Sequence, residues 1–318
     1  MILVLTNKWD ISADFVIREM ARRGMPYVRI HSEDIAGCQC TVRLPGRTLT
    51  IDTQKRPPFT LEDLRVVWYR RPGKVFDWMT KGERPPKDVQ IFVNEQWATW
   101  LEAIELSKCC RWVNPCAAAS SFENKIRQLE LADQIGFRIP RTIISNDPQN
   151  VREFARACGD KIVAKALFSP LLEGEREDRF VFTNRTSLLD LNDDESLRIS
   201  PTIFQEAICP KIDYRVTVVG GRVFAVKIIY PSSGEIDWRA EKRDVTFIPT
   251  ALPDAIEDRC REFVARAGLV FGAIDLVESE GGWYFLEINP SGEWGWLQQP
   301  VGLPIAQTLC DVFAELSA

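Results

Sequence analysis

The chain has very little histidine, because His31 is the single one among its 318 residues. One imidazole excludes His-x-x-x-His zinc sites and multi-histidine iron sites, and a Ser or Cys triad would have to rely on His31 alone. None of the nine cysteines forms a Cys-x-x-Cys pair, and most lie in apolar stretches typical of small core residues in a reducing compartment. Any chemistry that this chain performs is therefore expected to depend neither on metal thiolates nor on a histidine relay.

Two further absences restrict the compartment and the partners. No window reaches the roughly 18 apolar residues that span a membrane, and the apolar start over residues 1–5 is too short for a secretion signal. Forty basic and forty-five acidic residues give a net charge of −5, so no global positive field collects nucleic acid or anionic lipid. We expect a cytoplasmic protein that binds neither nucleic acid nor membrane.

The chain is long enough for two domains or three small ones. Strand, helix and strand patterns over residues 2–5, 14–23 and 27–30 predict a parallel α/β unit at the start. No Gly-x-Gly-x-x-Gly follows the first strand, so a dinucleotide fingerprint is absent. A long helix comes next, and the residues expected on its apolar face are Phe92, Trp97, Trp100, Leu101 and Ile104.

Asn114 and Pro115 end this first region, and we place a domain boundary near residue 117. A helix is predicted over 120–135, with strands following it. The predicted strands cover residues 138–145, 161–166, 181–183 and 202–205. Hairpins around Gly220 and Gly281, with helices over 255–267 and 305–316, complete a fold of α/β class with α+β character.

The most informative segment is the hairpin over residues 272–290. If its turn centres on Gly281, Asp275 lies opposite Glu287, and the strand period of two places Asn289 on the same face. The opposite face is apolar and holds Ile274, Leu276, Leu286 and Ile288. Two carboxylates opposite each other repel, so a divalent cation is expected to compensate, and two carboxylates with an amide oxygen are typical Mg²⁺ ligands. The alternative is a solvated edge hairpin, which the apolar neighbours disfavour.

Two cations stand out near other strands. Lys165 interrupts an apolar strand, where its ammonium needs an anion such as a nucleotide phosphate, although many strand lysines reach solvent instead. Arg215 shares a face with Asp213 and Thr217, and we expect it to contact a phosphate or carboxylate in bidentate fashion. The alternative for Arg215 is a surface pair with Asp213, which would contribute little.

A strand that runs into a linker gives a third element. Gln205 and Glu206 end the strand, and the backbone from there to Ile208 offers N–H and C=O groups that can read an adenine edge. Asp213 follows seven residues after Glu206 and is placed to accept hydrogen bonds from ribose hydroxyls.

Together these residues resemble the ATP-grasp superfamily over about residues 118–318. The resemblance rests on the following positions: Lys125, Gly136 to Thr142, Lys165, Gln205, Glu206, Asp213, Asp275, Glu287 and Asn289. A narrower resemblance, to the microviridin-type maturases of ribosomal peptides (graspetide synthetases), extends over nearly the whole chain. It rests on the runs WYRRP at Trp68–Pro72, NEQW at Asn94–Trp97, WVNP at Trp112–Pro115, DWR at Asp237–Arg239 and NPSGEWGW at Asn289–Trp296.

The resemblance implies an ATP-grasp fold with an N-terminal pre-ATP-grasp α/β domain over 1–117, a central subdomain over 118–205 and a C-terminal subdomain over 206–318. It implies ATP held by Lys125, Lys165 and the 205–213 segment, with Mg²⁺, in two ions or with Mn²⁺ as substitute, on Asp275, Glu287 and Asn289. Many superfamily ligases carry an arginine two residues before the metal-binding Asp; here that position is Ala273, so Arg215 has to supply the charge, and Arg215 and Lys165 become the catalytic cations.

The implied substrate is a ribosomal precursor peptide with a leader. An Asp or Glu side chain of this peptide would be phosphorylated by ATP and then joined to a Ser or Thr hydroxyl or a Lys amine, which closes a macrolactone or macrolactam. We place peptide-binding groups at Trp294 and Trp296 and in the cationic segment with Arg239, Lys242 and Arg243. Ordinary packing of the tryptophans, and a merely solvated loop, are the alternatives. A homodimer is expected by resemblance only.

Two other functions stay open at this point. An intermolecular ligase that adds an amino acid to a peptide or to another amino acid would use the same site residues. An ATP-binding regulatory protein without turnover is the third reading, and the intact metal set argues against it.

Overall fold

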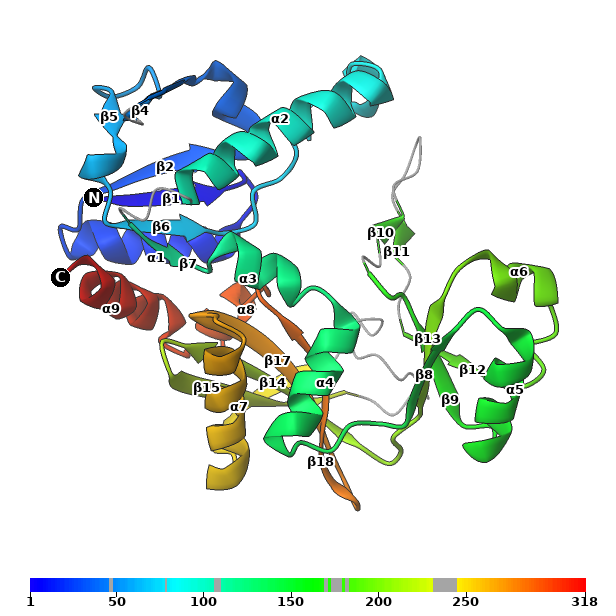
Figure 1. The fold of residues 1–318 in the computed structure, drawn as a ribbon. Helices are drawn as coiled ribbons and strands as arrows, with labels where there is room; N and C mark the ends of the chain where they lie inside the picture. Colours follow the sequence, from blue (N-terminus) through cyan, green and yellow to red (C-terminus); the bar gives the residue numbers. More distant parts are fainter. Residues whose placement is uncertain are drawn as a thin grey trace.

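The computed structural model describes residues 1–45, 48–77, 79–105, 110–168, 171–172, 179–180, 183–230 and 245–318. Its N-terminal region is built on a parallel four-stranded sheet in the order β2-β1-β6-β7 (Figure 1). These strands are β1 (Ile2–Thr6), β2 (Tyr27–His31), β6 (Val66–Tyr69) and β7 (Arg111–Val113). The parallel order confirms the predicted α/β start.

The two faces of this sheet are covered by different helices. Along β1, Ile2 and Val4 pack toward α1 (Ile11–Arg22), whereas Leu3 and Leu5 belong to the cluster that contains Leu101 of α2 (Lys87–Glu105). This alternation is the strand period of two applied to a sheet that is buried on both sides. The prediction for α2 was partly wrong, because Phe92 is 62% exposed and the inward face of the helix carries Val93 instead.

A small antiparallel sheet and short turns complete the N-terminal region. The sheet has the order β3-β4-β5, with β3 (Gln39–Arg43), β4 (Thr48–Asp52) and β5 (Phe59–Thr60). The 3₁₀ helices of this region are η1 (Ser32–Gly37), η2 (Leu61–Asp63) and η3 (Lys81–Glu83).

The link to the next region differs from the single helix predicted over 120–135. Two helices occur, α3 (Cys116–Ser121) and α4 (Lys125–Ile135), because Asn124 breaks the run and caps α4 by accepting the N–H groups of Ile126 and Arg127. Gly136 ends α4 in the left-handed conformation, with φ of 90°. Lys125 therefore occupies the first turn of α4, which the site uses.

The central region is a four-stranded antiparallel sheet in the order β12-β9-β13-β8, with its own small core around Val151, Ile162 and Phe204. Its elements are β8 (Thr142–Ser145), α5 (Pro148–Ala157), β9 (Ile162–Lys165), β12 (Asn184–Thr186), α6 (Asp194–Ile199) and β13 (Thr202–Glu206). The two-residue strands β10 (Leu171–Leu172) and β11 (Arg179–Phe180) pair with each other. In Figure 1 this region lies to the right of the other two sheets.

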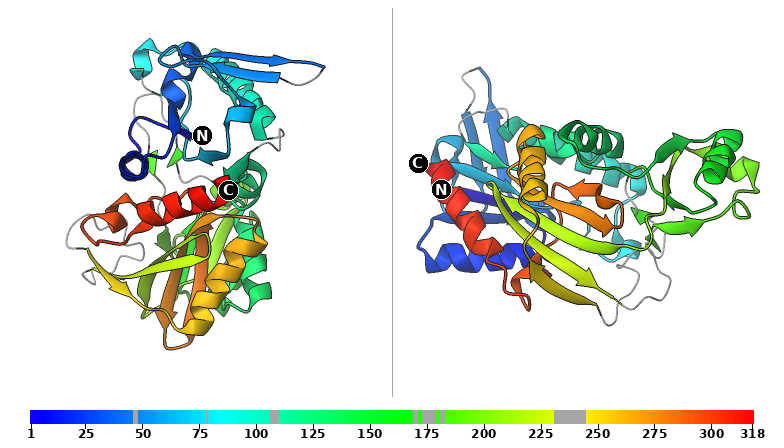
Figure 2. Two further views of the ribbon diagram at one scale, coloured as in Figure 1. Left: turned by 90° about the vertical axis from the view of Figure 1, so that its left-hand side faces the viewer. Right: turned by 90° about the horizontal axis from the view of Figure 1, so that it is seen from below.

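The C-terminal region is a five-stranded antiparallel sheet in the order β16-β15-β14-β17-β18. Its elements are β14 (Ile212–Val219), β15 (Arg222–Ile229), β16 (Thr246–Thr250), α7 (Asp254–Arg266), β17 (Phe271–Ser279), β18 (Gly282–Asn289), α8 (Gly295–Gln298) and α9 (Ile305–Ser317). Helices α4 and α7 cover one face of the sheet, and the other face packs partly on α9, which lies between this sheet and the N-terminal sheet (Figure 2). No described helix is both long and apolar enough to cross a membrane.

Candidate active site

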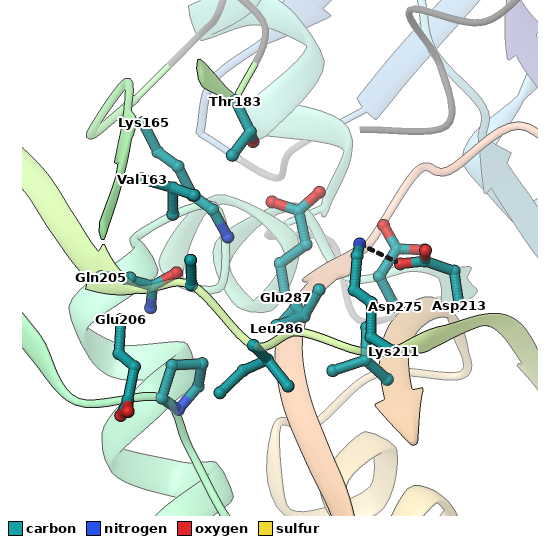
Figure 3. A pocket seen from close by; sticks show the side chains of 14 residues that line it. Val163, Lys165, Thr183, Gln205, Glu206, Lys211, Asp213, Asp275, Leu286 and Glu287 are labelled. Atoms are coloured by element: carbon teal, nitrogen blue, oxygen red, sulfur yellow. Dashed lines mark hydrogen bonds and ion pairs between the residues drawn. The ribbon is translucent and has the colours of Figure 1, made fainter. Parts of the chain in front are cut away.

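A cleft between the central sheet and the C-terminal sheet gathers most of the residues singled out in the sequence (Figure 3). It is lined by Pro140, Val163, Lys165, Thr183, Gln205, Glu206, Ala207, Ile208, Lys211, Asp213, Asp275, Val277, Leu286 and Glu287. Four carboxylates and two ammonium groups in this set come from β9, β13, the 207–211 linker, β14, β17 and β18. Segments more than 100 residues apart in sequence therefore meet at one polar site.

The hairpin of β17 and β18 has the register that places both carboxylates opposite each other. Asp275 pairs with Glu287, and Asn289, two residues further along β18, pairs with Ala273. The expected place of Leu286 was wrong, since a bulge after Asp275 makes Phe285 the partner of Leu276 and sends Leu286 to the cleft. The extra residue of the bulge re-aims the strand at the point where the two carboxylates stand.

Each of the two carboxylates has a cation beside it. Arg215 Nη1 lies 3.0 Å from Asp275 Oδ1, and both side chains are nearly buried, at 7% and 12% exposure. Lys125 Nζ lies 2.9 Å from Glu287 Oε2. The chain itself thus supplies one positive charge for each carboxylate, in addition to the divalent cation expected from the sequence. The alternative of a surface pair between Asp213 and Arg215 is wrong, because Arg215 is buried and faces Asp275.

Asp213 is held by two neighbours of its own. Lys211 Nζ donates to Oδ1 at 2.7 Å, and the Tyr230 hydroxyl donates to Oδ2 at 2.6 Å. Lys211 escaped the sequence analysis, although it stands two residues before Asp213, at the spacing that puts both side chains on one face of an extended segment. The site therefore has a further lysine at the end of the linker, and this lysine lines the cleft together with Asp275 (Figure 3).

Strand β13, which runs into the linker, presents its backbone to the cleft more than the side chain of Glu206. Arg141 binds the Glu206 carboxylate through two hydrogen bonds of 2.9 and 3.1 Å, which turns it away from the other polar groups and lowers its pKa (Figure 3). Gln205 donates from Nε2 to Thr142 at 3.0 Å, whereas its Oε1 is buried without a hydrogen bond in the described structure. An acceptor buried in this way suits a ligand amine or hydroxyl.

The charges and orphaned atoms of the cleft fit a nucleoside triphosphate with Mg²⁺. Arg215 carries buried Nε and Nη1 atoms that lack a well-aligned hydrogen bond among the described residues, and such donors are suited to phosphate or carboxylate oxygens. The cations are Lys125, Lys165, Lys211 and Arg215, against the carboxylates of Asp213, Asp275 and Glu287. These charges nearly balance, so they cannot by themselves neutralise a triphosphate. The carboxylates offer only oxygen ligands, which Mg²⁺ prefers.

The residues expected to contact a peptide are placed less favourably. Trp294 is completely buried in the core between the N-terminal and C-terminal sheets, so a role as a peptide wall is wrong for it and the packing alternative holds. Trp296 packs against Phe247 with ring centroids 4.3 Å apart. Arg239, Lys242 and Arg243 lie outside the described residues.

A second cleft of about 900 Å³ opens between α2, α3 and the start of α4. It reaches Asn124, which precedes Lys125, and Ser291, which follows Asn289 by two residues. It therefore approaches the β17–β18 hairpin from the side of α4. Its walls carry Glu102, Glu105, Glu123 and Arg127, and burial raises the pKa of Glu123. No sequence pattern predicted this cleft, because residues of three separate helices line it.

Comparisons with known proteins now add to this geometry. No family model matches the chain. The structure is similar over 99% of both chains to macrocyclase MdnC from Microcystis aeruginosa MRC, bound with precursor peptide MdnA, at 27% identity and a TM-score of 0.87. It is similar over 99% of this chain and 96% of the other to a RiPP-associated ATP-grasp ligase from Chryseobacterium gregarium in complex with ADP and a leader and core peptide, at 28% identity and a TM-score of 0.86.

Among curated proteins, a probable alpha-L-glutamate ligase of Psychromonas ingrahamii is 24% identical over 198 residues. This match covers 61% of the chain and 64% of that ligase, so it spans less than two thirds of either protein. The two peptide-bound structures, by contrast, match the N-terminal sheet as well as the cleft. The resemblance found in the motifs is confirmed, and the chain is an ATP-grasp ligase similar throughout its length to enzymes that modify ribosomal peptides.

Proposed function

We propose that this protein uses ATP to join side chains within a ribosomal precursor peptide. An Asp or Glu carboxylate would be linked to a Ser or Thr hydroxyl or to a Lys amine, giving a macrolactone or macrolactam. The observation that carries the proposal is the full-length similarity to two enzymes solved in complex with peptides, combined with a cleft lined by Lys165, Asp213, Asp275 and Glu287, with Arg215 beside Asp275.

The first step needs positioning and charge more than acid–base chemistry. The linker backbone from Glu206 to Ile208 and the Gln205 amide would hold the adenine, while Asp213 would face the ribose. Lys125, Lys165 and Lys211 would bind the phosphates. Mg²⁺ on Asp275, Glu287 and Asn289 would neutralise the charge that develops as the γ-phosphoryl group moves to the peptide carboxylate and ADP leaves.

Arg215 would then act on the second step. Its guanidinium is held beside Asp275, which lines the cleft, and from there it would bind the carboxylate that is activated and the oxyanion that forms on it. The hydroxyl or amine attacks the acyl carbon, phosphate leaves, and the nucleophile loses its proton. The peptide thus loses the elements of one water for each bond formed. The cleft between α2, α3 and α4 is the route by which the peptide reaches this point.

Finer parts of the proposal follow the resemblance. We propose two metal ions, with Mn²⁺ as a functional substitute, a leader segment that anchors the peptide, and a cytoplasmic homodimer. We also propose that residues 1–117, 118–205 and 206–318 behave as the pre-ATP-grasp, central and C-terminal units. Binding of the peptide to the cationic segment with Arg239, Lys242 and Arg243 belongs to the same proposal.

The second candidate function is an intermolecular ligase that adds an amino acid. The partial match to the probable alpha-L-glutamate ligase favours it, although that match leaves a large part of both chains uncovered. The same cleft residues would serve both reactions, so the products have to distinguish them.

Mass spectrometry separates the two functions. The purified protein is incubated with Mg-ATP and short peptides from its source cells, with precursor peptide MdnA as an additional probe. Loss of one water per bond, together with phosphate release, supports macrocyclisation. A gain equal to an amino-acid residue supports the intermolecular ligase. Bound ATP without phosphate release or any mass change, across all peptides, contradicts both.

A further inference from the structure

The segment that follows Glu287 is held by side chains to which neither the sequence motifs nor the proposed chemistry assign a role. Asn289, the amide ligand of the proposed metal set, ends β18, which is the edge strand of its sheet. An edge strand has one row of backbone groups that no neighbouring strand pairs. The positions on both sides of Asn289 are nevertheless bound, by Gln128 on one side and Asn114 on the other.

Gln128 acts as a substitute for a neighbouring strand. Its Oε1 accepts the N–H of Ile288 at 3.0 Å, and its Nε2 donates to the C=O of the same residue at 3.0 Å and to the C=O of Phe122 at 2.5 Å. The side chain is completely buried. A carboxamide carries the same donor and acceptor as a peptide group, so it can pair with an edge residue as a strand would.

Gln128 also connects the metal hairpin to the helix that carries Lys125. The two residues are three positions apart on α4 and so lie on the same face of the helix. Lys125 binds the Glu287 side chain, and Gln128 binds the backbone of the next residue, Ile288. Helix α4 therefore holds both the charge and the backbone of β18 at the point where the ligands stand.

Asn114 closes the other end of the segment. Its Oδ1 accepts the N–H groups of Val270 and Phe271, each at 2.8 Å, and its Nδ2 donates to the C=O of Phe271 and of Pro290, each at 2.8 Å. All four hydrogen-bonding positions of this buried amide are thus used. Asn114 ties the beginning of β17 to the residue that follows Asn289.

We propose that Gln128 and Asn114 are positioning residues for the metal-binding hairpin. They fix the backbone on both sides of Asn289, so that its amide oxygen stands beside the Asp275 and Glu287 carboxylates before any metal arrives. The inference rests on the proposed function, because Asn289 needs this placement only if it binds a metal ion. Partners that orient metal ligands commonly change metal affinity by 10- to 100-fold when they are removed.

The test measures metal binding directly. Mn²⁺ is titrated into the protein saturated with AMPPNP, and bound and free Mn²⁺ are separated by electron paramagnetic resonance. Gln128→Met keeps the length of the side chain and removes its three hydrogen bonds; we expect the Mn²⁺ dissociation constant to rise about tenfold. The matched control is Gln134→Met, on the same helix, whose exposed amide binds Arg266 and lies outside the cleft; its Mn²⁺ affinity stays unchanged.

A second variant tests the other end of the segment. Asn114→Asp retains the acceptor for Val270 and Phe271 and loses the donor to the C=O groups of Phe271 and Pro290, so we again expect weaker Mn²⁺ binding, by about tenfold. Excess Mg²⁺ should partly restore turnover in both variants, while the KM for peptide stays unchanged. Folded variants with a lower melting temperature and wild-type Mn²⁺ affinity would show a merely structural role and overturn the inference.

Asn289→Ala separates this inference from the proposed function. If Asn289→Ala leaves Mn²⁺ binding unchanged, the metal assignment itself fails, and the positioning role fails with it. If Asn289→Ala weakens binding and the Gln128 and Asn114 variants do not, the metal site stands and the positioning role is wrong.

Discussion

Two groups of ion pairs among the described residues have similar distances and differ in how their hydrogen bonds are completed. One group joins α1 to α9: Glu19 accepts from Arg22 and Arg23, and Arg23 also donates to Asp311 at 2.6 Å and to the C=O of Gln307. The other group lies at the cleft, where Arg215 faces Asp275 at 3.0 Å with buried Nε and Nη1 atoms that lack a well-aligned hydrogen bond among the described residues.

We infer from this difference that the α1–α9 pairs serve the fold, whereas the Arg215 pair is arranged to take up a ligand. A buried donor without an aligned acceptor costs roughly 1–3 kcal/mol, so a chain retains it only where something else compensates. The α1–α9 pairs are complete within the protein. The Arg215 pair would be completed by phosphate or carboxylate oxygens. Proximity of opposite charges alone therefore does not separate these two groups, whereas the completeness of their hydrogen bonds does.

Glu287→Gln should break the cleft group with the largest effect. The variant removes one carboxylate from the metal set and leaves Lys125 facing a neutral amide. We expect ATP-dependent product formation to fall at least about 1,000-fold, which corresponds to about 4 kcal/mol of transition-state stabilisation. Peptide mass and phosphate release measure the effect. Glu280→Gln, at the exposed tip of the same hairpin, is the control with normal turnover; near-normal turnover in Glu287→Gln would remove the residue from the metal site.

Arg215→Lys sharpens the comparison between the groups. A lysine retains the charge and loses the planar fork that binds two oxygens, so we expect the chemical step to slow about 100-fold while nucleotide affinity changes less than about threefold. Single-turnover kinetics and nucleotide titration separate the two quantities. Arg222→Lys, which alters the pair with Asp311 on the α1–α9 side, is the matched control and should leave both unchanged. Equal effects of the two substitutions would contradict the distinction.

The sequence predicted the parts of the site that depend on strand periodicity. Asp275 could be placed opposite Glu287 because a hairpin register follows from its turn. The bulge that moves Leu286 into the cleft was not predictable, since an inserted residue leaves no mark in an alternating pattern. Local periodicity therefore determines which residues share a face, and the packing of the second strand determines where that alternation is interrupted.

Contacts between elements that are distant in the chain could not be predicted from the sequence, for a different reason. Gln128 is a polar residue on an otherwise apolar helix face, so in the sequence it only weakens the prediction of a buried face. Its role becomes visible when the structure places Ile288 beside it. Trp294 follows Asn289 closely in the sequence, yet its burial depends on other parts of the chain. It packs with residues of the distant N-terminal sheet and with α9, which follows it. Such roles are set by tertiary neighbours, and one sequence carries no signal that pairs them.

Glu19→Gln tests the complete group and should have the smallest effect, confined to stability. The hydrogen bonds from Arg22 and Arg23 lower the pKa of Glu19 to about 2 from an ordinary value of 4.5. Because the folded-state pKa is the lower one, the carboxylate contributes its stability above about pH 4.5 and loses it as the pH falls toward 2. We expect the variant to be less stable by about 2 kcal/mol at pH 7, as for hydrogen bonds to charged groups.

The pH dependence makes this last prediction specific. In urea unfolding, the difference in unfolding free energy between wild type and Glu19→Gln should stay constant from pH 8 to about pH 5.5 and shrink as the pH is lowered to about 3. Turnover per folded molecule should be unchanged, because Glu19 lies between α1 and α9 and not at the cleft. A difference that persists undiminished at pH 3 would mean that Glu19 acts through packing, and a loss of turnover would mean that the two groups of ion pairs are coupled.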